Sequence, residues 1–310
     1  MKLFDLHCDT ATRLLGEKQA LYENDFHISL KRADYLSNYA QVMAVWTDRR
    51  LSDSQGFSRF LEVFDNLKNE VEINKDHCSL VRNSSELSDA WSCKKAALIL
   101  AVEDARILEN DIARIEKLRQ CGVKILTLNW SGASCIGGAH NTCNGLTDFG
   151  IQVLEKCFEI GIIPDISHCS FEGARMTLEL AKKNNKPIIA SHSDSYSVCT
   201  HTRNLLDRDA RDIASLSGLI GINLCPEHLT SSSSASIDDI MRHIEHYLAL
   251  GIENTLAMGG DLDGTNLPNG FSGIQDIYKV ANEMQRLNYS TEITEKVLYK
   301  NALIFFKNNL

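Results

Sequence analysis

The residues able to do chemistry gather in five short motifs, each next to an apolar, strand-like run. They supply imidazoles and carboxylates, which bind divalent metal ions, without paired thiolates. His7 and Asp9 are two residues apart, and because side chains alternate along a strand, both should point to the same spot. The set predicts a two-metal hydrolase with zinc or a similar ion. The motifs are Asp5-Leu6-His7-Cys8-Asp9, Val102-Glu103-Asp104, Ser167-His168, Ser191-His192 and Gly260-Asp261-Leu262-Asp263.

A lone histidine is more often structural than a metal ligand, so its surroundings decide its interpretation. His168 and His192 directly follow apolar runs, and either could cap a helix, but with His7 and Asp9 they complete two metal sites. Glu103 ends the apolar run 97–102, where an unpaired carboxylate would be costly, so a bridging ligand is the better interpretation. Cys8 should point to the opposite strand face, into the core. Five histidines without such context are expected to be structural or exposed: His27, His77, His228, His243 and His246.

Composition narrows the class of protein. The 310 residues are 44% hydrophobic and 24% charged, as in an ordinary globular protein with a large core. The net charge of -9 and the lack of a basic stripe argue against nucleic acid as a partner. No signal-peptide pattern and no membrane-length apolar stretch is found, and the ten cysteines form no CxxC pair. We expect a soluble cytoplasmic protein with free thiols and no membrane partner.

Eight apolar runs alternate with segments of helical period, which predicts one α/β domain spanning 1–310. Continuous apolar strands are typical of a parallel sheet covered on both faces, and eight such units close most economically into a (β/α)8 TIM barrel. An open doubly wound sheet is the alternative, but a Gly-rich phosphate turn is missing after the first strand. The expected strands are 3–6, 40–46, 96–102, 123–130, 162–166, 187–190, 219–224 and 256–258; expected helices include 107–120, 149–160, 171–183, 237–250 and 274–287.

These motifs resemble those of the membrane (renal) dipeptidase family, peptidase family M19, within the amidohydrolase superfamily. The resemblance runs from the first strand to Lys300-Asn301-Ala302-Leu303. The sequence shows no lipid-anchor signal and in this respect is similar to the soluble prokaryotic branch of the family. Its most specific part is the stretch 191–199 followed by Arg203-Asn204. The other matching parts are Asp5-Leu6-His7-Cys8-Asp9, the strand ends at Glu103 and His168, and Gly259-Gly260-Asp261-Leu262-Asp263-Gly264.

The resemblance implies a binuclear zinc dipeptidase in which a metal-bridging hydroxide attacks the peptide bond of a free dipeptide. It implies that Asp261, rather than Asp263, shuttles the proton to the leaving amine and that Arg203 grips the substrate carboxylate. A homodimer would be usual for the family, and the second residue of the substrate could be of L or D configuration. The implied ligands of the two Zn²⁺ ions are His7 and Asp9 for one, His168 and His192 for the other, and Glu103 as the bridge.

One position departs from the family pattern. Mammalian members have a substrate-contacting histidine where this chain has Trp130. A tryptophan offers a flat apolar wall and one N–H donor, so oxyanion stabilisation would depend on the metal, or on His140 if the loop 137–140 folds inward.

Three functions remain open from the sequence. The first is dipeptide hydrolysis; the second is hydrolysis of N-acyl amino acids or another amide at the same two metals; the third is a metal-binding protein without catalysis. Arg203 discriminates between the first two, because a carboxylate anchor favours substrates with a free C-terminus. Asp261 argues against the third, since a spare carboxylate beside complete metal sites has an obvious use in proton transfer.

Overall fold

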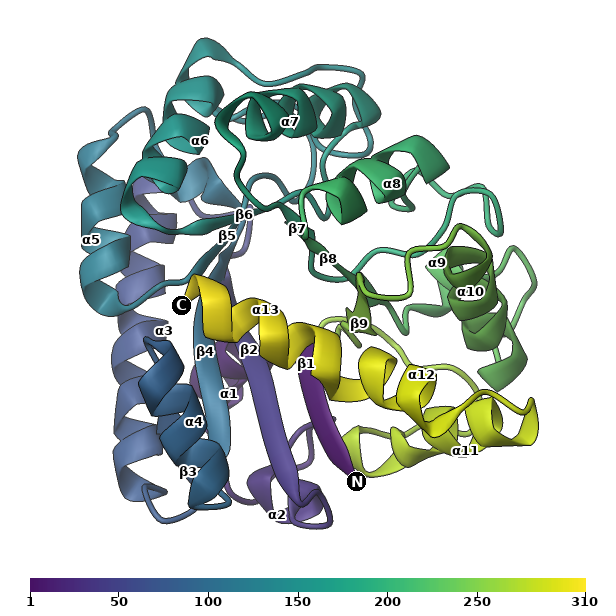
Figure 1. Cartoon of the computed structure of the whole chain (residues 1–310). Coiled ribbons are helices and arrows are strands. Elements are labelled where there is room, and N and C mark those ends of the chain that lie inside the picture. The colour runs from purple at the N-terminus through teal and green to yellow at the C-terminus, as the bar shows by residue number, and fades with distance from the viewer.

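Eight parallel strands close into a barrel that helices surround (Figure 1). The structure is a computed structural model that describes all residues from 1 to 310. The barrel is closed because β2 pairs with both β1 and β4, while β9 pairs with both β8 and β1. An open sheet would leave two strand edges unpaired, so the predicted barrel is confirmed and the doubly wound alternative is excluded.

All eight predicted strands are present. A ninth, β3, was missed; it is short and pairs with the first residues of β4, whereas β5 pairs with the last ones. β3 has only one buried residue, Cys78, which explains the absence of an apolar run. The strands are β1 (Lys2–Cys8), β2 (Asn38–Trp46), β3 (Cys78–Leu80), β4 (Ala96–Glu103), β5 (Ile125–Thr127), β6 (Ile163–Asp165), β7 (Ile189–Ala190), β8 (Leu219–Ile222) and β9 (Leu256–Met258).

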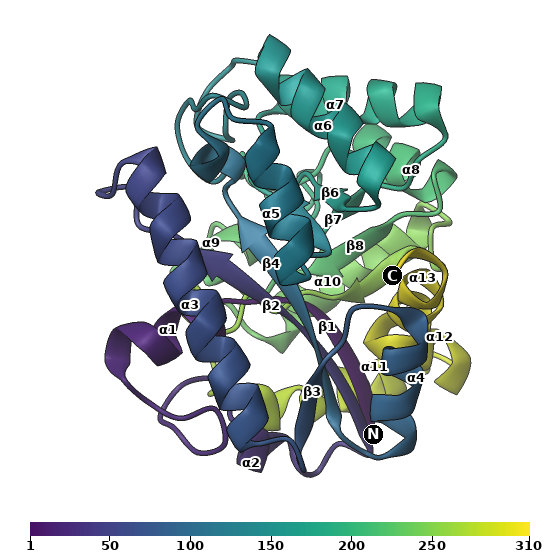
Figure 2. The same cartoon turned by 90° about the vertical axis from the view of Figure 1, so that its left-hand side faces the viewer.

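The helices form the outer layer, and Figure 2 looks onto the side covered by α3, α4 and α5. Of the predicted helices, 107–120 is wrong in its middle, because Glu109 and Asn110 adopt left-handed backbone and separate a short 3-10 turn (Ala105–Leu108) from α5. The helices are α1 (Thr10–Glu17), α2 (Leu30–Ala33), α3 (Asp53–Ile73), α4 (Ser84–Ser92), α5 (Ala113–Cys121), α6 (Asp148–Ile160), α7 (Phe171–Asn184), α8 (Asp207–Ser215), α9 (Pro226–Leu229), α10 (Ile237–Ala249), α11 (Tyr278–Arg286), α12 (Thr291–Glu295) and α13 (Asn301–Asn309), with one further 3-10 turn (Ile274–Asp276) and a π-helical turn (Lys296–Lys300).

Strand register brings the C-terminal strand ends to one level. Trp46 of β2 is paired with Glu103 of β4, Glu103 with Thr127 of β5, and Thr127 with Asp165 of β6. Side chains that follow these ends therefore open onto the same face of the barrel, where active sites of such barrels lie.

β1 is irregular where the first metal-ligand candidates lie. Asp5 pairs with Gln41 but Cys8 pairs with Met43, so β1 holds one residue more than β2 over this stretch. Such a bulge redirects side chains. Cys8 is fully buried and its Sγ lies 3.4 Å from Met43 Sδ, which confirms its predicted place in the core. Asp9 lies just beyond the strand and precedes the first turn of α1, so simple strand alternation does not position it.

The core is one continuous cluster of buried apolar side chains inside and around the barrel. The C-terminal helix α13 lies across β1 and β9 (Figure 1), and the Phe306 ring stacks on that of Phe4 with centroids 4.8 Å apart. None of the helices combines the length and apolarity needed to cross a bilayer.

His243 on α10 links the segment after β7 to the end of α9 and should make the stability of the fold pH-dependent. Its Nδ1 accepts the Ser195 N–H at 3.0 Å and its Nε2 lies 2.9 Å from the Leu229 carbonyl, and burial lowers its pKa to about 4. A depressed folded-state pKa stabilises the fold above the ordinary value of about 6.5, and this contribution is lost as pH falls toward 4. Between pH 7 and pH 5, urea unfolding should show the wild type losing about 2 kcal/mol more than His243→Gln. Equal losses in the two proteins would contradict this.

Candidate active site

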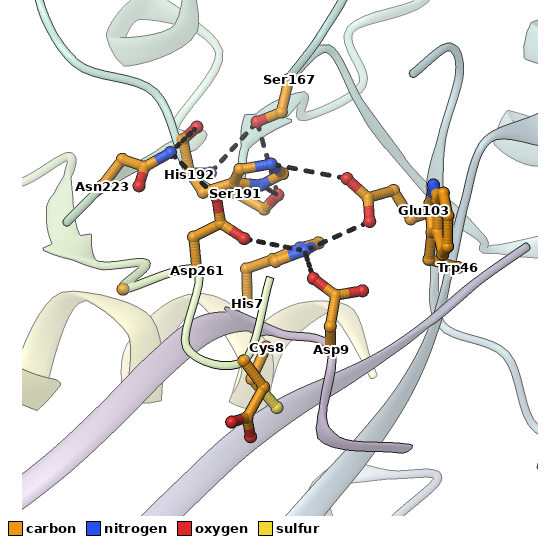
Figure 3. A network of polar contacts seen from close by, with 12 residues as sticks. His7, Cys8, Asp9, Trp46, Glu103, Ser167, Ser191, His192, Asn223 and Asp261 are labelled. Atoms are coloured by element: carbon orange, nitrogen blue, oxygen red, sulfur yellow. Dashed lines mark hydrogen bonds and ion pairs between the residues drawn. The ribbon is translucent and has the colours of Figure 1, made fainter. Parts of the chain in front are cut away.

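The predicted metal ligands and the predicted proton shuttle meet at the C-terminal ends of the strands. Figure 3 shows the carboxylates of Asp9, Glu103 and Asp261 pointing toward the His7 imidazole. His7 Nε2 lies 3.6 Å from Asp9 Oδ2 and 4.0 Å from Asp261 Oδ1. Two groups of three have donor atoms close enough to share a metal ion: His7, Glu103 and His192; and His7, Asp9 and Asp261.

Glu103 stands between the two halves of this cluster. Its Oε2 is 3.6 Å from His7 Nε2, while its Oε1 is 2.9 Å from His168 Nε2 and 3.6 Å from His192 Nε2. Each carboxylate oxygen thus faces a different set of nitrogen donors. This is the arrangement that a carboxylate bridging two cations requires.

The hydrogen bonds of His168 and His192 leave a lone pair on each Nε2. His168 Nδ1 lies 3.0 Å from the Trp130 carbonyl, to which it must donate. Ser191 Oγ gives its hydrogen to Asp165 Oδ2 at 2.6 Å and therefore accepts from His192 Nδ1 at 2.7 Å. The two bare Nε2 atoms are only 2.9 Å apart. A shared cation would relieve this repulsion, because neutral imidazoles held by partners at Nδ1 are typical metal ligands.

His7 and Asp9 also lack partners for buried polar atoms. His7 Nε2 and Asp9 Oδ1 are buried without a hydrogen bond, which is costly unless another group satisfies them. With imidazoles on either side and the carboxylates between them, the donor set fits zinc or a similar divalent cation. The cluster therefore fits the binding of divalent cations.

The pKa values of the cluster residues also favour a bound cation. Burial, with the nearby charge of Asp9, raises the pKa of Glu103 to about 8 and that of Asp261 to about 7. Burial lowers the pKa of His168 and His192 well below the usual value, so both stay neutral. The pKa of His7 is instead raised, because the carboxylates of Glu103 and Asp9 outweigh its burial, so a positive charge is favoured between these groups. Crowded carboxylates that resist ionisation and imidazoles that resist protonation are stabilised in their ligand forms by bound cations.

Asp261 and Asp263 diverge, although they are two residues apart. Both lie beyond β9 with left-handed backbone, at φ 52° and 72°, so strand alternation does not apply. Asp261 Oδ2 is 3.4 Å from Asn223 Nδ2 and its Oδ1 faces His7. Asp263 instead binds the Thr10 hydroxyl at 2.5 Å and the His27 N–H at 2.6 Å. Of the two, only Asp261 faces the cluster. Asp263 instead stabilises the segments that begin and follow α1.

A cavity of about 550 Å³ opens onto the cluster, a size typical of small-molecule sites. Arg203 lines it and is only 4% exposed. Its Nη2 donates to the His192 carbonyl at 3.3 Å, whereas Nε and Nη1 are buried without partners. A buried guanidinium with unused donors beside a cavity is suited to an anionic ligand group.

Trp130 and His140 both line this cavity. The Trp130 ring packs edge-on against Trp46, with centroids 5.1 Å apart, and forms a flat wall. The backbone N–H of His140 donates to the His168 carbonyl at 2.7 Å and its Nδ1 lies 3.0 Å from Thr202 Oγ1. The loop 137–140 therefore folds inward, as the sequence left open, and places His140 beside the metal-ligand candidates.

Sequence reasoning missed three polar residues of the site. Asn223 contacts Asp261, and His201 and His228 line the cavity. His228 was expected to be structural or exposed; it lines the cavity, because the short helix α9 after β8 brings it beside His201, with ring centroids 4.7 Å apart. Asn223 directly follows β8, so a polar residue at a strand end was the available signal. His201 lies two residues before Arg203, inside the family-like stretch.

A closed parallel barrel with such a cluster at its C-terminal face defines a metal-dependent hydrolase of the α/β-barrel class. Comparison with known proteins gives the family. The sequence profile of the membrane dipeptidase family, peptidase family M19, matches residues 1–309. The chain belongs to this family and is a hydrolase of the metallo-dipeptidase class.

Individual relatives are distant in sequence and close in fold. An uncharacterised dipeptidase of Schizosaccharomyces pombe, C965.12, is 26% identical over 69% of this chain and 53% of its own length. A protein named for the pqqA 5′ region of Klebsiella pneumoniae is 24% identical over 74% of this chain and 88% of its own. A Rhodobacter sphaeroides metallopeptidase, solved with a phosphinate mimic of L-Ala-D-Ala, superposes with a TM-score of 0.92 at 19% identity, covering 100% of this chain and 99% of that one.

Proposed function

We propose that this chain hydrolyses free dipeptides with two divalent metal ions, zinc being the first to test. His7 and Asp9 would hold one ion, His168 and His192 the other, and Glu103 both. The observation that carries this is the placement of the two Glu103 oxygens, one 3.6 Å from His7 Nε2 and the other 2.9 Å from His168 Nε2. When bound, such ions supply a nucleophilic water at neutral pH and polarise the scissile carbonyl.

The chain's own residues would move the proton and orient the substrate. Asp261 is partly buried, with 13% of its side chain exposed, and faces the cluster. Desolvation raises its pKa to about 7, so it can take a proton from the attacking water and pass it to the leaving amine. Asn223 Nδ2 holds the other Asp261 oxygen in place. Trp130 would form a wall beside the substrate, and His140 would offer a polar group on the same side.

Arg203 would bind the carboxylate at the C-terminal end of the dipeptide. Its unpaired Nε and Nη1 are fixed in a buried position at the cavity wall, where they can donate to a ligand carboxylate. This anchor would place the scissile bond one residue before a free C-terminus, and so favour free dipeptides over their C-terminal amides. Because the Rhodobacter relative was solved with an L-Ala-D-Ala mimic, both configurations of the second residue belong in the test.

The test is an activity assay of the metal-loaded protein and its chelated form. The substrates are L,L and L,D dipeptides, the same dipeptides as C-terminal amides, and matched N-acetyl amino acids. Cleavage of free dipeptides that is lost on chelation and restored by zinc supports the proposal. Cleavage of the N-acetyl amino acids alone would assign a different amide substrate, and no cleavage of any substrate would contradict catalysis.

Arg203→Ala should lower kcat/KM for free dipeptides by about 100-fold, mainly through KM, because a charge-assisted contact to the carboxylate is lost. Arg203→Lys keeps the positive charge but loses the two parallel N–H donors of the guanidinium. Its kcat/KM should therefore lie between those of the wild type and Arg203→Ala. Both variants are compared with the wild type on a free dipeptide and its amide. An equal loss on the amide would show that Arg203 does not read the carboxylate. Circular dichroism checks the fold, because Arg203 also donates to the His192 carbonyl.

A further inference from the structure

The cavity wall next to Arg203 carries two histidines that the catalytic scheme above does not use. His201 and His228 have ring centroids 4.7 Å apart and both line the cavity. Their ring nitrogens have defined roles, because each Nδ1 faces a group that can only donate.

His201 Nδ1 accepts the backbone N–H of Arg203 at 3.3 Å. His228 Nδ1 lies 3.3 Å from Asn223 Nδ2, whose two hydrogens are shared with the His192 carbonyl at 3.3 Å and Asp261 Oδ2 at 3.4 Å. This amide cannot be turned around, because Asn223 Oδ1 accepts the Cys225 N–H at 2.7 Å, so a proton on His228 Nδ1 would face a group without an acceptor. A neutral imidazole that accepts at Nδ1 carries its proton on Nε2. Both histidines therefore carry an Nε2–H donor, and neither Nε2 has a hydrogen-bond partner within the protein.

These two donors and Arg203 make one side of the cavity rich in hydrogen-bond donors. Burial and the Arg203 charge keep both imidazoles neutral, since they lower the pKa of His201 and bring that of His228 to about 2. Glu227, on the same side of the cavity, has an exposed side chain, and solvent screens its charge. Donors that are partly withdrawn from water and lack partners are satisfied by a ligand that brings acceptors.

We infer that His201 and His228 form a subsite for an acidic side chain, Asp or Glu, on the second residue of the dipeptide. The inference rests on the proposed function, in which Arg203 takes the α-carboxylate and so places that side chain beside the two histidines. Their Nε2–H groups donate to the side-chain carboxylate, whereas an amide side chain of the same shape presents only one acceptor oxygen.

The first test compares Ala-Glu with Ala-Gln, and Ala-Asp with Ala-Asn, each with an L or D second residue, on the metal-loaded protein. The kcat/KM for the acidic dipeptide should exceed that for its amide by about tenfold, as for one charge-assisted hydrogen bond. In His201→Asn and His228→Asn this ratio should fall toward one. His77→Asn is the matched control, because His77 lies exposed against Tyr22, away from the cavity, and should keep the ratio.

Ala-Lys completes the panel. Efficient hydrolysis of dipeptides with an acid-to-amide ratio near one, or with a preference for Ala-Lys, would overturn the subsite while leaving the proposed function intact. If no dipeptide is cleaved, the proposed function fails, and titration calorimetry of the metal-loaded protein with glutamate and glutamine decides on the subsite. Glutamate binding about tenfold more tightly than glutamine, with the difference lost in His228→Asn, would support it; equal binding would overturn it.

Discussion

Asp261→Asn should lower kcat for a free dipeptide by about 10³-fold while the protein still binds metal, because asparagine keeps the shape but cannot carry a proton. KM should change little, since Asp261 is not one of the groups assigned to substrate binding. The measurement is steady-state kinetics with the metal content of each sample determined by atomic emission. Normal kcat with full metal occupancy would remove the proton-transfer role.

Asp263→Asn is the matched comparison for this prediction. Asp263 has the same chemistry two residues away, but its carboxylate binds Thr10 and His27 rather than facing the cluster. The loss of these contacts should lower the free energy of unfolding by about 1–3 kcal/mol and kcat by less than about tenfold. A larger loss of kcat for Asp263→Asn than for Asp261→Asn would reverse the two assignments.

Glu103→Gln should weaken metal binding by more than about 100-fold and reduce activity accordingly, because one uncharged amide oxygen cannot serve two cations. Thermal unfolding gives an independent readout. Metal at about 100 times its Kd stabilises a protein by about 2.7 kcal/mol, so zinc should raise the Tm of the wild type but not that of Glu103→Gln at the same concentration.

Glu62→Gln is the control, because Glu62 is an exposed carboxylate on α3 that pairs with Arg59 and belongs to neither group of metal-ligand candidates. Its Tm should respond to zinc as the wild type does. If Glu103→Gln also binds two equivalents of zinc with unchanged affinity, Glu103 is not a bridging ligand.

The barrel could be predicted from the sequence because its strands are continuous apolar runs that leave a clear signal in the chain. β2 and β4 are buried along nearly their whole length, which only a sheet covered on both faces allows. β3 was missed for the opposite reason, since it is three residues long with one buried side chain. The break before α5 was also missed, because left-handed residues at 109 and 110 carry no glycine signal.

The donor atoms of the cluster could also be predicted from the sequence, because the type of a residue and its position after a strand are local properties. His7, Glu103, His168 and His192 were found in this way. His228 was not, because it lies six residues beyond β8, in the short helix α9, and only the folding of this segment brings it to the cavity. Proximity across loops depends on packing between distant segments, which no local pattern encodes.

The sequence by itself determined the parallel barrel, the kind of donor atoms at its C-terminal face and the family, because apolar patterning and residue type act over a few neighbouring residues. Only the tertiary structure decided which atoms are available. The protons of His168, His192, His201 and His228 are directed by hydrogen-bond partners, among them the Trp130 carbonyl, Ser191 and Asn223. The folded chain brings these partners into place and so selects the tautomer, and the tautomer selects whether a histidine binds a cation or an anion.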